Sequence, residues 1–341
     1  MNTKRKIRGV NLGGWLVLEK WMTPTLFANR KAVDETTFCM ELGSGAEKIL
    51  RDHWESFITP ADFKWLKDHG INAVRIPIGH WIFGDCKPYF GAIDILDRAM
   101  KTAEEYGVEV LLDLHAAPGC QNGFDNGGIQ GVMEWHLHPE NVDRSVAFIR
   151  RIAERYKDCN HLLGIQLLNE PRWDVPLEIL REYYHRGYEA VREHIPAEKT
   201  AVVIHDSFRL KEWKDFMQEP RYSNVILDTH MYQCFTEEEK AFAISRHVHR
   251  AAVERKQDID EMMEYFPVCV GEWSLGLVPA VYEGFDSLQK ETALRAYAAA
   301  QLLSFEEGAG WFFWNYKLEE GVMPAWSFRE CVERGWLPEH F

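Results

Sequence analysis

Short apolar runs alternate with amphipathic segments along the chain. The apolar runs cover residues 6–17, 71–77, 108–115, 162–170, 201–206, 224–232, 267–273 and 310–316. Short runs of this kind are typical of strands that are buried on both faces of a parallel sheet. The pattern therefore predicts eight parallel strands.

The segments between these runs are predicted to be helices. In residues 93–106, apolar side chains recur at helical spacing, and Gly107 stands where a C-terminal cap is expected. Thr59 and Pro60 are typical of a helix start, and Gly70 marks the end of that segment. The segment "ETALRAYAAAQLLSFEEG" is a third predicted helix.

Eight strands that alternate with helices predict an α/β fold, the (β/α)8 TIM barrel, spanning residues 1–341 as a single domain. A doubly wound open sheet is the alternative. It is disfavoured because no glycine-rich phosphate loop follows the first strand.

Composition and charge narrow the range of partners. Hydrophobic residues make up 46% of the chain and charged residues 27%, which is ordinary for a globular domain with a large core. The net charge of −14 repels nucleic acid and anionic membranes, so we expect neither as a partner. We expect most of the 13 Trp residues in the core, although flat rings also line sugar-binding clefts.

The N-terminal stretch and the cysteines bear on the compartment. "MNTKRKIRGVNLGGW" is basic but lacks the apolar segment and small-residue cleavage site of a signal peptide. The seven cysteines are odd in number and widely spaced, so reduced thiols explain them better than a disulfide framework. We therefore expect a cytoplasmic protein.

Polar side chains follow the predicted strands at the points where the strands end. In a barrel, the carboxyl ends of the strands meet at one mouth, where active sites lie. Each side chain alone has an ordinary structural explanation, but their recurrence at equivalent positions favours a functional site. These residues are Arg75, His115, Asn169, Glu170, His205, Asp206, His230, Tyr232, Glu272, Trp273, Trp314 and Asn315.

Two acids from separate strands suit glycoside hydrolysis. One acid, protonated, assists the leaving group, and the other, ionised, attacks the sugar or activates water. Arg75 beside one carboxylate would keep it ionised, whereas burial and negative charge would raise the pKa of the other. Asn169, next to Glu170, is suited to bond a sugar 2-hydroxyl.

Other chemistries find less support in the sequence. His115, His205 and His230 at strand ends could bind a metal, but no H-E-x-x-H motif occurs. No G-x-S-x-G nucleophile elbow occurs either. "LGSGAEK", residues 42–48, lacks the Lys-Ser/Thr ending of a phosphate loop, so we predict an ordinary loop.

Several stretches resemble glycoside hydrolase family 5, and within it the exo-β-1,3-glucanase group of yeasts and fungi. "LNEP" alone is moderately specific for the family, whereas the long first and third stretches are much more specific for the group. Together they extend over nearly the whole chain. They are "IRGVNLGGWLVLE", "AVRIPIGHW", "DLHAAPGCQNGFDNGG", "LLNEP", "DTHMYQCF", "VGEWS" and "GWFFWNYK".

The resemblance implies a role for each matched position. Glu170 would be the acid/base and Glu272 the nucleophile of a retaining mechanism that needs no metal or other cofactor. The further implied roles are Arg75, His115, Asn169, His230 and Tyr232 as supporting residues, Trp314 under the cleaved sugar, Glu19, Asp125 and Asn126 as ligands of a terminal glucose that close the pocket, and Phe124 and Phe235 as a clamp on the entering glucan. Two positions depart from the pattern, Lys20 after Glu19 and Tyr316 in place of a second Trp, and we expect both at pocket rims or loops.

The implied function is exo hydrolysis of β-1,3-linked glucans or gluco-oligosaccharides from the non-reducing end, with β-1,6 linkages as a further substrate class. An endo-acting glucanase or mannanase with an open cleft is the alternative, although Glu19 and the loop 119–128 indicate a blocked end. A non-catalytic sugar-binding barrel is disfavoured because both acids are present. The sequence leaves the linkage preference and the oligomeric state open.

Overall fold

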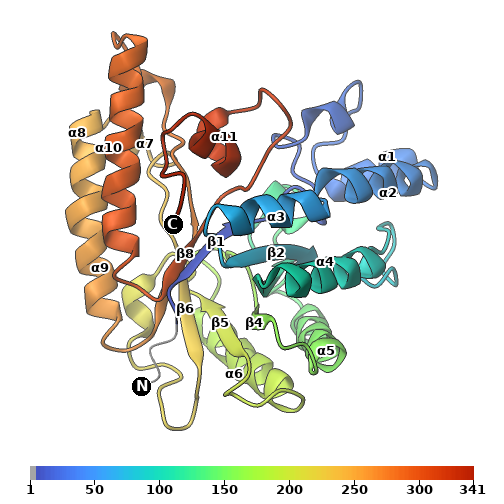
Figure 1. Cartoon of the computed structure of the whole chain (residues 1–341). Coiled ribbons are helices and arrows are strands. Elements are labelled where there is room, and N and C mark those ends of the chain that lie inside the picture. The colour runs from blue at the N-terminus through green and yellow to red at the C-terminus, as the bar shows by residue number, and fades with distance from the viewer. Residues whose placement is uncertain (1–4) are drawn as a thin grey trace.

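In the computed structural model, which describes residues 5–341, eight parallel strands close into a barrel (Figure 1). Each strand pairs with its neighbours in sequence, and the last strand closes on the first, with Ile7 opposite Gly310. The strands are β1 (Ile7–Asn11), β2 (Ala73–Gly79), β3 (Glu109–Ala116), β4 (Leu162–Gln166), β5 (Ala201–His205), β6 (Val225–His230), β7 (Val268–Trp273) and β8 (Gly310–Phe313). The predicted TIM barrel is confirmed.

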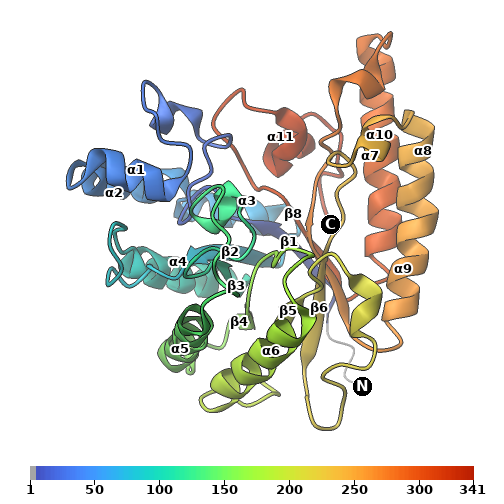
Figure 2. The same cartoon turned by 180° about the vertical axis from the view of Figure 1, so that it is seen from behind.

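Helices surround this barrel, with α5 and α6 on one side and α8, α9 and α10 on the other (Figure 2). The α-helices of the described residues are α1 (Glu35–Leu42), α2 (Gly45–Phe57), α3 (Pro60–Asp68), α4 (Ile93–Tyr106), α5 (Pro139–Tyr156), α6 (Leu177–Arg192), α7 (Glu237–Lys240), α8 (Ile244–His249), α9 (Arg255–Met262), α10 (Ser287–Phe305) and α11 (Phe328–Glu333). Among residues 5–341, none of these is long and apolar enough to cross a membrane.

Local sequence signals set the helix ends as expected. Gly107 closes α4 in the left-handed region with φ of 64°, where a side chain would be strained. At the start of α3, Thr59 and Asp62 form a capping box in which each side chain accepts from the other residue's backbone N–H. That helix ends at Asp68, just before Gly70.

The barrel interior is divided into two layers. At the amino-terminal ends of the strands, a small apolar cluster fills the barrel, and polar side chains occupy the space above it. The outer faces of the strands pack against the helices and form the main core. The lower cluster consists of Ile7, Ala73, Leu111, Ala201, Val203, Ile226, Cys269 and Phe312. All seven cysteines of the chain are free.

Candidate active site

Arg75 on β2 is the centre of the polar layer and has no exposed surface. Its Nη1 donates to Asn11 Oδ1 over 2.8 Å, and its Nε donates to Gln166 Oε1 over 2.8 Å. Its Nη2 pairs with Asp113 Oδ2 at 3.0 Å, and Gln166 donates in turn to Asp228 over 2.6 Å. A buried cation is stable only with such partners. The sequence analysis did not predict these residues as part of the site, because each is a single polar residue within or at the end of an apolar run. They are Asn11, Asp113, Gln166 and Asp228.

Glu272, at the end of β7, is held through both of its carboxylate oxygens. Arg75 Nη1 donates to Oε1 over 2.9 Å, and the Tyr232 hydroxyl donates to Oε2 over 2.9 Å. Arg75 also donates through Nη2 to Asn169 Oδ1 over 2.6 Å, which leaves the buried Asn169 Nδ2 without a partner. The carboxylate is therefore fixed in orientation beside an unused amide donor.

Glu170 lies four residues beyond the end of β4 and has a left-handed backbone with φ of 41°. A side chain in this region is strained, and such strain is concentrated at functional sites. His230 Nδ1 lies 2.7 Å from Glu170 Oε1, and Asn126 Nδ2 donates to Oε2 over 3.0 Å. The contact of Asn126 is thus with Glu170 itself.

The two candidate catalytic carboxylates lie close together. A carboxylate oxygen of Glu170 and one of Glu272 are within 4.8 Å of each other, and His230 Nδ1 reaches the latter at 3.4 Å. Enzymes that invert the anomeric centre need carboxyl groups about 6.5–9.5 Å apart, whereas retaining enzymes keep them at about 5–5.5 Å. The spacing fits direct attack by one of the two groups.

The pKa directions differ from the sequence-based expectation that the acid/base has the raised pKa. Burial raises the pKa of Glu272, and it outweighs the lowering effect of His230 and Arg75. Burial also acts to raise the pKa of Glu170, but the hydrogen bond and charge of His230, together with His205 and the hydrogen bond from Asn126, outweigh it and lower that pKa to about 2. Burial opposes the charged form of His230, yet Glu272 and Asp228 raise its pKa well above 6.5. Of the three side chains Glu170, His230 and Glu272, His230 therefore holds the proton, next to Glu170.

Trp314, which follows β8, forms one wall of the site together with His115. Their rings are stacked with centroids 5.5 Å apart and planes at 7°. Gly13 allows this packing, because a Cβ there would lie 2.5 Å from the Trp314 ring. His115 Nδ1 is fixed by Asp113 Oδ2 at 2.6 Å, and its buried Nε2 has no partner.

Glu19 and Asp125 form a second acidic pair in the same site. Glu19 Oε2 accepts from Trp21 Nε1 over 2.9 Å, whereas the buried Oε1 has no partner. Burial and the charge of Asp125 raise the pKa of Glu19 well above its ordinary value, and burial raises the pKa of Asp125. A buried oxygen without a donor is an incomplete arrangement that a ligand hydroxyl would satisfy. The role of Trp21 was not predicted, although it stands two residues after Glu19.

The predicted aromatic clamp residues lie on separate segments. Phe235 is 63% exposed and packs edge-on against Tyr232, with centroids 5.4 Å apart. Phe124 immediately precedes the short 3-10 helix Asp125–Gly127. Within residues 5–341, no ring contact joins Phe124 and Phe235. Trp326 contacts Tyr232 and Phe235, and the sequence offered no signal for it because it lies in the short 3-10 helix Pro324–Trp326, well beyond the last strand.

Of the two departures from the family pattern, Tyr316 lies in the loop that follows β8, which agrees with the expected rim or loop position. Tyr316 is fully buried, and its hydroxyl donates to Asp62 over 3.0 Å, which links the loop after β8 to α3. Lys20 donates to the Ala32 carbonyl over 2.9 Å.

The three histidines that were considered as metal ligands, His115, His205 and His230, do not lie together in one possible metal site. Among the described residues, two sets of side chains are close enough to share a cation: His205 with Asp228 and His230, and Glu170 with His230 and Glu272. His115 belongs to neither set. Both sets also engage His230, which already bridges carboxylates.

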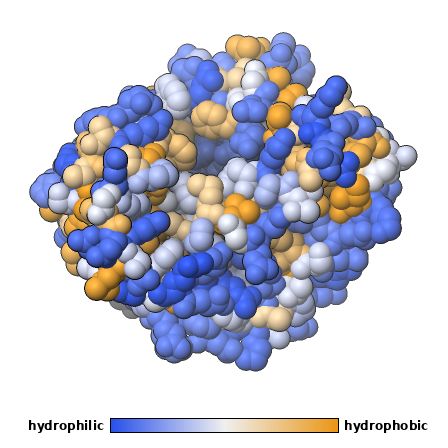
Figure 3. Space-filling model, turned by 90° about the horizontal axis from the view of Figure 1, so that it is seen from above, coloured by the Kyte–Doolittle hydropathy of each residue, from blue (hydrophilic) through white to orange (hydrophobic). Residues whose placement is uncertain are grey.

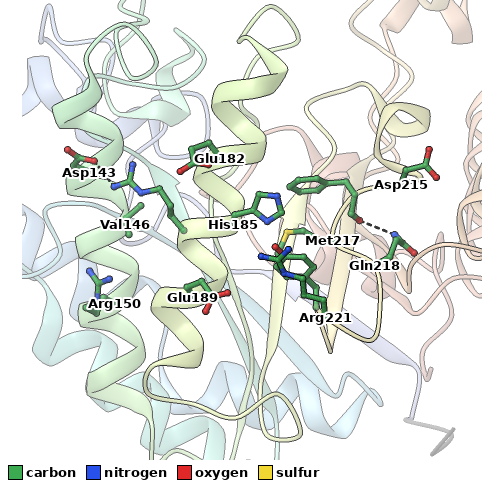
Figure 4. A pocket seen from close by; sticks show the side chains of 13 residues that line it. Asp143, Val146, Arg150, Glu182, His185, Glu189, Asp215, Met217, Gln218 and Arg221 are labelled. Atoms are coloured by element: carbon green, nitrogen blue, oxygen red, sulfur yellow. Dashed lines mark hydrogen bonds and ion pairs between the residues drawn. The ribbon is translucent and has the colours of Figure 1, made fainter.

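Figure 3 shows the molecule from above, which is the face at which α10 begins and near which α11 lies in Figure 1. This face is hollowed near its centre. A separate hollow of about 700 Å³ lies outside the barrel, between α5, α6 and the segment before β6 (Figure 4). Several charged groups in this outer hollow are already paired, as Arg186 is with Asp143 and Arg150 with Glu193. It contains none of the predicted site residues.

A closed parallel barrel with two buried carboxylates at the carboxyl ends of its strands, within 4.8 Å of each other, defines a glycoside-hydrolysing barrel of the retaining class. The sequence model described as Cellulase (glycosyl hydrolase family 5) matches residues 34–320, and the chain belongs to this family.

Similar proteins agree with this assignment. The chain is 36% identical to a glucan 1,3-beta-glucosidase of Blumeria graminis, over 98% of this chain and 87% of the relative. It is 35% identical to a glucan 1,3-beta-glucosidase of Schwanniomyces occidentalis, over 98% and 88%. The crystal structure of rutinosidase from Aspergillus niger has the same fold, with a TM-score of 0.84 at 22% identity over 98% of each chain.

Proposed function

We propose that the protein is a retaining exo-β-glucosidase that releases glucose from the non-reducing ends of β-1,3-linked glucans and gluco-oligosaccharides, with β-1,6 linkages as a further substrate class. The observation that carries this proposal is the pair Glu170 and Glu272, with carboxylate oxygens within 4.8 Å of each other. The names of the relatives from Blumeria and Schwanniomyces support the choice of linkage.

In the first step, Glu272 attacks the anomeric carbon, and the bond to the leaving oxygen breaks. Arg75 and Tyr232 aim the carboxylate oxygens and favour the ionised form. The leaving oxygen takes a proton from Glu170, which receives it from His230 across the 2.7 Å hydrogen bond. The products are a glucosyl ester on Glu272 and the shortened sugar.

In the second step, water replaces the leaving group. Glu170 takes a proton from the water, whose oxygen attacks the anomeric carbon and releases Glu272 as a carboxylate. Asn169 Nδ2, which is buried without a partner, is available to donate to the sugar 2-hydroxyl in both transition states. Because each step inverts the anomeric carbon, the glucose keeps its β configuration.

We attribute the restriction of cleavage to the chain end to the acidic pair Glu19 and Asp125. The unpartnered Glu19 Oε1 is suited to accept from a hydroxyl of a terminal glucose, and the raised pKa of both acids allows one to be protonated and to donate. An internal glucose unit would have to extend its chain past these two groups. Asn126 positions Glu170 in addition to lining the pocket.

Product analysis tests the proposal. The protein is incubated without added metal with laminaritriose, cellotriose, gentiobiose and long laminarin. Glucose as the only early product, formed mainly from the β-1,3 substrates, is the expected result. A ladder of internal fragments, or a preference for cellotriose, would retain the roles of Glu170 and Glu272 but overturn the exo assignment.

A further inference from the structure

An exposed aromatic pair on the loops after β4 and β5, Trp173 and Phe208, has no role in the proposed function. Trp173 is 56% exposed and Phe208 is 39% exposed. Their ring centroids lie 6.1 Å apart with planes at 70°, so the edge of one ring meets the face of the other. A single exposed Trp needs no explanation, but this pair is built into the loops of the site.

Two loops hold the pair in place. Ser207 Oγ donates to the Arg172 carbonyl over 3.2 Å, and Arg209 Nη2 donates to the Val175 carbonyl over 3.0 Å. The loop after β4 is therefore fastened to the loop after β5. Ser207 and Phe208 both have left-handed backbones, with φ of 54° and 57°. Two consecutive residues other than glycine in this region are strained, and such strain is maintained where a side chain must be aimed.

Ring contacts lead from this pair to the acid/base. Phe208 packs against His205 with centroids 5.2 Å apart, and His205 packs against His230 at 4.4 Å. His230 in turn contacts Glu170. Trp173 follows Glu170 by three residues, so their Cα atoms are at most about 11 Å apart. The pair therefore lies on the Glu170 side of the site, within reach of a short oligosaccharide.

The sugar units of the leaving group are expected on this side of the site. Glu170 protonates the leaving oxygen, so the sugar units released from the cleaved bond extend past Glu170, whereas the terminal glucose lies by Trp314 and Glu19. The Arg172 guanidinium lies over one side of the Trp173 ring, 5.9 Å from its centroid. The exposed part of the indole offers a flat apolar surface on which a glucosyl ring can pack. We propose that Trp173, supported by Phe208, is the platform for the second glucosyl unit of the leaving group. This inference rests on the proposed function and deepens it.

The test compares two substrates that differ by this one unit. Laminaribiose has one glucosyl unit beyond the cleaved bond, and laminaritriose has two. In Trp173→Ala, kcat/KM for laminaritriose is expected to fall about tenfold, because one stacking contact is lost, while that for laminaribiose changes less than about twofold. An equal loss on both substrates, or no loss on either, would overturn the inference.

Matched variants separate stacking from bulk. Trp173→Tyr keeps a flat ring and is expected to act on laminaritriose nearly as the wild type does. Trp173→Leu keeps apolar bulk without a ring and is expected to resemble Trp173→Ala. Tyr265→Ala is the control, because Tyr265 is also exposed but precedes β7 at the opposite end of the barrel. If the wild type releases no glucose from either substrate, the proposed function itself fails, and that outcome is distinct from a missing selective loss.

Discussion

The Tyr232 hydroxyl donates to Glu272 Oε2 over 2.9 Å, while Arg75 holds the other oxygen. A hydrogen bond to a carboxylate favours its ionised form and so lowers its pKa. Burial works in the opposite direction on Glu272 and prevails. Attack on the anomeric carbon therefore depends on a carboxylate whose ionisation the two donors support.

Tyr232→Phe removes this donor but keeps the ring contacts. The pKa of Glu272 should rise further, so the acid limb of the kcat/KM profile should move to higher pH, because the ionised carboxylate loses a hydrogen bond that stabilises it. We expect kcat to fall at least about tenfold. The measurement is a pH–rate profile on laminaribiose, and an acid limb that stays in place would contradict the role given to Tyr232.

Azide distinguishes the two carboxylates. Glu272→Ala should lose roughly 10⁴-fold or more in kcat, and azide should restore turnover and yield a glucosyl azide of inverted, α configuration. Glu170→Ala should lose about 10²–10⁴-fold, and with an activated leaving group azide should yield the β-azide. NMR of the products assigns both configurations. Full activity in Glu170→Ala would disprove the assignment of the acid/base.

His230→Asn tests the proton held beside Glu170. The wild-type pKa of His230 is raised well above 6.5, so the protonated form persists to high pH and is lost as pH rises through that value. Without the ring, the proton must be held by Glu170 alone, and the alkaline limb of kcat/KM should move toward lower pH. An alkaline limb unchanged in position would show that His230 does not supply the proton.

Glu35 predicts a pH dependence of stability that is independent of catalysis. Burial raises its pKa from 4.5 to about 8, against the hydrogen bonds from Leu18 N and Trp81 Nε1. A raised folded-state pKa contributes stability that is present below pH 4.5 and is lost as pH rises through about 8. Relative to Glu35→Gln, the wild type should therefore lose on the order of 4 kcal/mol of unfolding free energy between pH 5 and pH 9.

Urea unfolding of both forms across this pH range measures the difference. Glu47→Gln is the control, because Glu47 is exposed on α2. A difference between wild type and Glu35→Gln that does not vary with pH would contradict the predicted ionisation of Glu35.

The strands were predictable because both of their faces are buried, so each strand appears in the sequence as a run of apolar residues. Their limits were less predictable. The run 162–170 continues past the end of β4 at Gln166, since Leu167 and Leu168 stay buried while the chain turns toward the left-handed Glu170. In the same way, the run 6–17 continues past Asn11, because the following loop is also buried.

The site was predictable where a polar residue follows a strand, as with Glu170 and Glu272. It was not predictable where a polar side chain points inward from within a strand, as with Gln166, or where a distant segment reaches back, as with Trp326. The pKa order could not be read from the sequence at all, because it depends on the 2.7 Å contact between His230 and Glu170.

The apolar cluster at the lower end of the barrel closes the site at that end, so the site has no second opening through the barrel. The space among Ile7, Leu163, Ile226 and their neighbours is only about 10 Å³, too small for a sugar. Glucose cut from a glucan must therefore leave through the opening by which the glucan entered, and only after the shortened chain has withdrawn. Such an enzyme does not travel along its polymer: it takes one unit per encounter and returns to solution between cuts.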